Sequence, residues 1–122
     1  MANMDYILLG ETLATDTNIQ MVRGDTLSFG FEYDGTDQEL DEAYFTCKKS
    51  QSSEQIIFQK ALRYGITKDF SVAGVKRYII RIDPTDTKNV EAGDYYYDFQ
   101  VKLNGDVFTF LIGALTIKQD IT

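Results

Sequence analysis

Hydrophobic and polar side chains alternate with a period of two along most of this sequence. Between residues 95 and 103 every second residue is apolar: Tyr95, Tyr97, Phe99, Val101 and Leu103. The segment 26–33 alternates in the same way, through Leu27, Phe29, Phe31 and Tyr33. A period of two places alternate side chains on opposite faces of a strand. Both segments are therefore predicted to be strands of an antiparallel sheet with one buried and one solvated face.

Five further segments are predicted to be strands: 18–23, 42–49, 55–62, 76–83 and 106–118. The side chains that we expect to point inward from the first four are Ile19 with Met21 or Val22; Ala43, Phe45 and Cys47; Ile56 and Phe58; and Tyr78, Ile80 and Ile82. Asn104-Gly105 predicts a tight hairpin between the last two strands, because both residues tolerate positive φ. Pro84 opens a helical turn or wide loop, which we expect Asp86 to cap. Short strands separated by frequent turns favour a two-sheet sandwich over residues 17–122.

Residues 1–16 are not assigned to that sandwich. The segment fits a loose tail, an extra edge strand, or an arm that docks on a neighbouring molecule. The first five residues carry no lysine or arginine, whereas a secretory signal peptide begins with a basic stretch. We therefore expect no export by a signal peptide.

The last strand is apolar on both faces, because Phe108, Phe110 and Ile112 are expected to form a second hydrophobic face. A strand of this kind is either covered on both sides or exposed as a partner surface. Tyr44 and Tyr96 are predicted to lie on outer faces as well. These five residues are our candidate interface, and a dimer or ring contact through them would be the natural assembly.

The ionisable side chains argue against several functions. The formal net charge is -7, which would repel phosphate backbones and anionic membranes, so we expect neither nucleic acid nor membrane as a partner. The chain has no histidine and a single cysteine, Cys47, which removes the commonest general base and zinc ligand. Cys47 is expected to be a buried, inert thiol. We predict no enzyme, no catalytic residue, no cofactor and no metal site, and leave open whether the acidic segment 34–42 binds calcium or is simply solvated.

Tyr95 is the candidate for a structural tyrosine corner. It follows the loop Glu91-Ala92-Gly93-Asp94 at the start of a central strand. In immunoglobulin-like domains a tyrosine at such a position bonds back to the backbone of the preceding loop. The fold class that we predict is therefore all-β, an immunoglobulin-like antiparallel β-sandwich of about seven to eight strands.

Three runs carry a resemblance to a narrower family: Arg23-Gly24-Asp25-Thr26-Leu27-Ser28-Phe29; Asp83-Pro84-Thr85-Asp86-Thr87 followed by Ala92-Gly93-Asp94-Tyr95-Tyr96-Tyr97-Asp98; and Gly105 to Ile117. Their order over residues 19–122 resembles small β-sandwich proteins of tailed phages and prophages. It is similar to the N-terminal domain of siphophage baseplate upper proteins. The resemblance implies a virion structural or assembly protein at the tail or baseplate, with no catalytic residues to carry over.

The expected function is therefore non-catalytic assembly through protein–protein interfaces, with other virion or tail proteins as partners and with a homo-oligomer as the expected state. The chain would be made in the bacterial cytoplasm and end in the virion. The alternative is a carbohydrate- or ligand-binding sandwich module, in which exposed tyrosines such as Tyr44, Tyr64 and Tyr96 would stack on the ligand.

Overall fold

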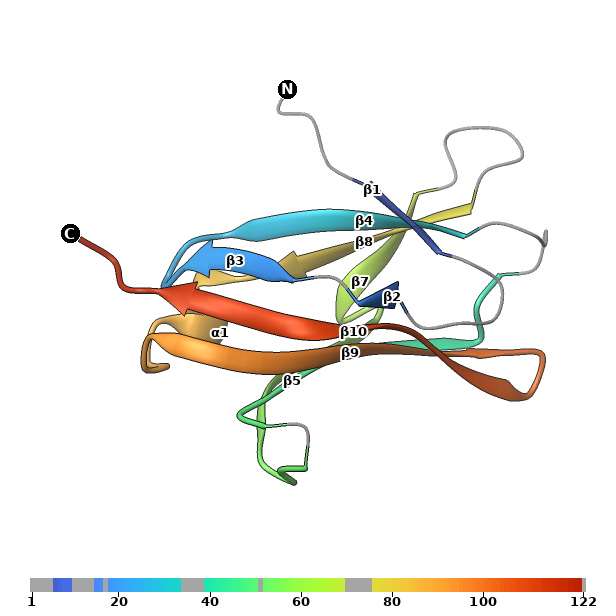
Figure 1. Ribbon diagram of the computed structural model, residues 1–122. Helices are drawn as coiled ribbons and strands as arrows, with labels where there is room; N and C mark the ends of the chain where they lie inside the picture. The colour runs from blue at the N-terminus through green and yellow to red at the C-terminus, as the bar shows by residue number, and fades with distance from the viewer. Residues whose placement is uncertain are drawn as a thin grey trace.

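The structure is a computed structural model that describes residues 6–9, 15–16, 18–33, 39–50, 52–69 and 76–121. Within these residues it contains ten strands and one short helix (Figure 1). The elements are β1 (Tyr6–Leu9), β2 (Thr15–Asp16), β3 (Ile19–Val22), β4 (Leu27–Tyr33), β5 (Glu42–Lys48), β6 (Ile56–Leu62), β7 (Gly65–Asp69), β8 (Lys76–Ile82), α1 (Pro84–Thr87), β9 (Gly93–Leu103) and β10 (Asp106–Lys118).

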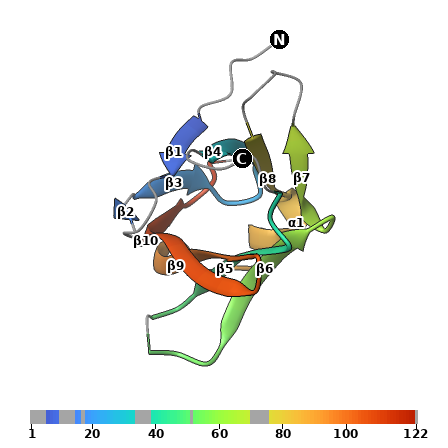
Figure 2. The same cartoon turned by 90° about the vertical axis from the view of Figure 1, so that its right-hand side faces the viewer.

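The strands form two layers that face each other across the core, as Figure 2 shows. One layer has the order β1-β4-β8-β7 and the other β6-β5-β9-β10, with β2 and β3 both pairing with β10. The layers join where β6 pairs with β7, through Ala61 with Gly65 and Leu62 with Ile66. The protein is thus an all-β, immunoglobulin-like sandwich.

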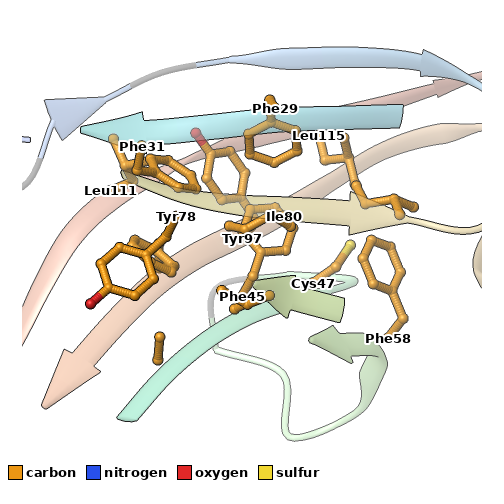
Figure 3. Packing of buried hydrophobic residues seen from close by; sticks show 14 of the residues in the cluster. Phe29, Phe31, Phe45, Cys47, Phe58, Tyr78, Ile80, Tyr97, Leu111 and Leu115 are labelled. Carbon is orange, nitrogen blue, oxygen red and sulfur yellow. The ribbon is translucent and has the colours of Figure 1, made fainter. Parts of the chain in front are cut away.

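The periodic strands bury the faces that the sequence predicts. The inward residues of β4, β8, β5 and β9 form one hydrophobic cluster (Figure 3). Phe31 of β4 stacks on Phe99 of β9 with ring centroids 4.4 Å apart, and this contact joins the two layers. Phe45 stacks on Tyr97 at 5.0 Å. Cys47 is completely buried in the same cluster. Such aromatic pairs add stability beyond the area that they bury.

The local turns also agree with the sequence. Asn104 and Gly105 both have positive φ, 53° and 87°, and they connect β9 to β10 in the predicted hairpin. The segment after Asp83 forms α1, and the Asp83 backbone N–H donates a hydrogen bond of 2.7 Å to the Asp86 carboxylate. Asp86 therefore caps the helical turn as expected.

Two β-bulges change the expected faces. A register shift between Thr109 and Leu111 places Phe108 opposite Val101 but Ile112 opposite Asp98. Phe108 consequently packs against the core, whereas Ile112 lies on the outer face. The expectation that Phe108 and Ile112 share an outer face is wrong, because an extra residue in one strand reverses the alternation that follows it. The Phe110 side chain lies outside the part that the structure describes.

The second bulge lies in the pairing of β5 with β6. Cys47 pairs with Phe58 but Lys48 pairs with Ile56. Phe58 is buried as predicted, while Ile56 is 47% exposed instead of pointing inward. The strands predicted from the sequence do not include β7, Gly65–Asp69. Of the segment 1–16, the structure describes only β1 and β2, which are paired with β4 and β10.

A charged cluster lies where the two layers join. Lys60 points inward from β6 and is only 8% exposed. Its ammonium lies 2.5 Å from the Asp86 carboxylate and 3.3 Å from that of Asp83. A Cβ added to Gly65 would lie 2.6 Å from Cδ of Lys60. The glycine therefore leaves the space that the lysine stem occupies.

Candidate interaction surface

The outer face of β5, β9 and β10 carries the candidate surface. Two rows of side chains cross these strands in register: Lys48, Tyr96 and Ala114 in one, and Thr46, Asp98 and Ile112 in the other. The rows are two residues apart along each strand, so their side chains lie on the same face. We call Thr46, Lys48, Tyr96, Asp98 and Ile112 the Tyr96 patch.

The Tyr96 patch combines accessible apolar area with a shallow hollow. Tyr96 is 37% exposed and Ile112 is 40% exposed. A hollow of about 240 Å³ is lined by all five residues of the patch together with Ser50 and Tyr97. Large side chains that remain exposed next to each other indicate a contact surface.

Opposite charges flank the apolar part of the patch. Burial raises the pKa of the Asp98 carboxyl above its ordinary value, and the positive charge of Lys48 acts in the opposite direction. Beside them, the Gln59 side-chain amide donates a hydrogen bond of 2.9 Å to the Thr46 hydroxyl. The patch thus has one cation, one partly buried anion and a fixed hydroxyl around Tyr96.

The structure brings together only part of the predicted interface. Tyr96 and Ile112 are neighbours in the patch. Tyr44 lies on the outer side of β5 but lines a separate depression with Tyr64. The sequence analysis does not include Thr46, Lys48 and Asp98 in the candidate interface. The alternation could have indicated them, because they occupy the outward, polar positions of the same predicted strands.

Tyr95 secures the loop that precedes this face. It is 7% exposed, and its hydroxyl donates a hydrogen bond of 2.5 Å to the backbone carbonyl of Glu91, four residues earlier. This is the bond that characterises a tyrosine corner. It fixes the start of β9, the strand that carries both Tyr96 and Asp98.

The described residues show no assembled reactive centre. Burial raises the pKa of the Cys47 thiol to about 12, so the sulfur is protonated and a weak nucleophile near neutral pH. No group of three or more acidic or cysteine side chains within the described ranges is arranged to hold a metal ion. Of the acidic segment 34–42, residues 34–38 lie outside the described residues, and Glu39 forms an ion pair with Lys68 at 2.8 Å. None of the helices that the structure describes has the length and apolarity to cross a membrane.

Two facing, largely antiparallel layers and the tyrosine corner at Tyr95 are features of immunoglobulin-like β-sandwich domains, and the chain has this fold. No family model and no curated protein matches the sequence. Among solved structures, the chain is similar to PbICP-C, solved in complex with falcipain-2. The TM-score is 0.50 at 10% identity, over 95% of this chain and 99% of that one. This likeness shows the fold alone.

Two further solved structures are more distant. The extracellular domain of the voltage-gated sodium channel beta4 subunit, described as a parallel homodimer, has a TM-score of 0.44 at 11% identity over 93% of this chain and 99% of that one. The NK cell receptor NKp44 has a TM-score of 0.44 at 19% identity, over 86% of this chain and 100% of that one.

Proposed function

We propose that the chain is a non-catalytic interaction module of a phage or prophage particle, at its tail or baseplate, and that it binds another protein through the Tyr96 patch. The observation that supports this role is the exposure of Tyr96 and Ile112 beside Lys48 and Asp98 on the outer face of the sheet. Interfaces of this kind combine an aromatic anchor with a polar rim.

The particle context is supported by the sequence resemblance alone. In that context the chain is made in the bacterial cytoplasm and then incorporated into the virion, where its partners are other tail proteins. A buried thiol, and no grouped metal ligands among the described side chains, fit a role in binding rather than turnover.

The first experiment tests the context. The host that encodes the chain is induced, the particles are purified, and their proteins are quantified by mass spectrometry. The proposal expects the chain at a fixed stoichiometry with tail proteins. Its absence from intact particles would contradict the proposal.

The second experiment tests the surface. The double variant Tyr96→Ser with Ile112→Ser should fold normally and be lost from the particles. Val107→Ser removes an exposed apolar side chain, 59% exposed, from the hairpin end of β10, where Val107 pairs with Lys102 and not with a strand position of the patch. This matched control should be incorporated as well as the unmodified chain. Equal incorporation of the double variant would exclude the patch.

A second candidate function is carbohydrate or ligand binding in the hollow of the Tyr96 patch. The hollow offers an aromatic ring from Tyr96 with a hydroxyl from Thr46 and a carboxylate from Asp98, a combination suited to a polar ligand. A glycan array with the purified chain tests it. Binding that is lost in Tyr96→Ser but kept in Val107→Ser would favour this function over assembly.

A further inference from the structure

We propose that the protein bound by the Tyr96 patch is a second copy of the same chain, docked about a two-fold axis; this inference rests on the function proposed above. In a two-fold contact the same surface is used by both partners, so a residue that faces another is faced by it in return. A patch with both signs of charge is complementary to itself, whereas a patch with one sign repels itself.

The Tyr96 patch has this self-complementary arrangement. Lys48 pairs in register with Tyr96, while Asp98 lies in the next row, opposite Thr46 and Ile112. The cation and the anion are therefore diagonal neighbours beside the exposed tyrosine. In a two-fold contact centred near Tyr96, Lys48 of each copy faces Asp98 of the other, and the exposed parts of Tyr96 and Ile112 lose water between them.

The charges of the whole chain favour the same place. The formal net charge is -7, so two copies repel each other over most orientations. A patch whose own charges balance reduces that repulsion at close approach. Within one chain, burial disfavours the ionised form of Asp98 and Lys48 offsets this only in part. A second ammonium from the other copy would stabilise that carboxylate.

Charge reversal with complementation provides the test. Sedimentation velocity over a range of concentrations measures dimerisation of the unmodified chain, of Lys48→Glu, of Asp98→Lys, and of an equal mixture of the two variants. The dimer of each single variant should have a Kd at least about tenfold higher than the dimer of the unmodified chain, because positions 48 and 98 then carry like charges at both symmetric contacts. The mixture should dimerise again, because the new carboxylate of one variant meets the new ammonium of the other.

Matched controls separate this contact from general charge effects. Lys88→Glu and Asp25→Lys make the same charge changes at exposed positions outside the patch and should leave the dimer intact. Far-UV circular dichroism confirms folding. If Asp98→Lys does not fold, Lys48→Glu and Tyr96→Ser take its place, and both must weaken the dimer.

Three results would overturn the inference: a monomer up to about 1 mM, a dimer indifferent to both reversals, or a mixture no more associated than its components. If the chain is monomeric but still enters particles through Tyr96 and Ile112, the second copy is excluded as the partner and the proposed function stands. If the chain dimerises through the patch but is absent from particles, the dimer stands and the proposed function is contradicted.

Discussion

The buried charge of Lys60 gives the sharpest test of how the two layers are held together. The Lys60 and Asp86 side chains are 10% and 18% exposed, and their charged groups lie 2.5 Å apart. Removing one partner of a fully buried ion pair costs about 3–5 kcal/mol, whereas an exposed pair contributes about 0–1 kcal/mol. Because this pair retains some contact with water, we expect Lys60→Met to lower the free energy of unfolding by about 2 kcal/mol.

The second arm of the experiment is Asp86→Ala. This change removes the ion pair and also the hydrogen bond from the Asp83 N–H, which contributes about a further 1 kcal/mol. We expect a loss of about 3 kcal/mol for this variant alone. The double variant removes both Lys60 and Asp86, so neither remains as a buried charge that has lost the other. Its free energy of unfolding should fall by about 3 kcal/mol, well below the sum of the two single losses, about 5 kcal/mol.

Urea denaturation followed by circular dichroism measures all four proteins. The exposed pair of Lys68 and Glu39, with side chains 38% and 51% exposed, provides the control cycle. Its coupling should stay below about 1 kcal/mol. Losses that add within about 0.5 kcal/mol in the Lys60 cycle would refute the argument, because they would show that the pair does not act as a unit.

Three other substitutions test separate parts of the structure. Gly65→Ala should lower the free energy of unfolding, measured by thermal denaturation, by about 1–3 kcal/mol, because the new Cβ would meet the Lys60 stem. The control Gly24→Ala, also at positive φ but with no atom within 4 Å of the added Cβ, should lower it by less. Equal losses in the two variants would exclude the steric cause. At protein concentrations too low for dimers, Asp98→Asn should raise the free energy of unfolding measured in urea at pH 7, because burial raises the folded-state pKa of this carboxyl and its ionised form therefore lowers the stability of the single folded chain. That gain over the unmodified chain should disappear as the pH is lowered and Asp98 takes up its proton; a gain that persists at low pH would contradict the argument. Tyr95→Phe should cost about 1 kcal/mol in urea denaturation through the lost bond to the loop carbonyl, and an unchanged midpoint would contradict that assignment.

The sandwich could be predicted from the sequence because its main signal is local. Alternation along β4, β8 and β9 specifies which side chains face inward, and no knowledge of the neighbouring strands is needed. The hairpin at Asn104 and Gly105 is equally local, since it depends on two adjacent residues that accept positive φ. Tyr95 was placed by its position after a short loop.

The rest depends on contacts between distant segments. The bulges that turn Phe108 inward and Ile56 outward arise from pairing with a partner strand, which the alternation of one strand does not encode. The ion pairs of Lys60 are likewise not local, since Asp83 and Asp86 come beside it only in the folded chain. The Tyr96 patch needed the register of three strands before Lys48 and Asp98 could be seen as neighbours.

The parallel pairing of β3 with β10 determines how the domain would respond to tension. Ile19 to Val22 lie in register with Leu115 to Lys118. The pair is secured before β3 by Asn18, whose side-chain oxygen accepts a hydrogen bond from the Ala114 N–H, and after it by the ion pair of Arg23 with Asp120. A force applied to the chain just before β3 and just after β10 pulls the two parallel strands in opposite directions along their axes. All the hydrogen bonds between them are then strained at once instead of opening one by one, so this pair of strands forms a mechanical clamp.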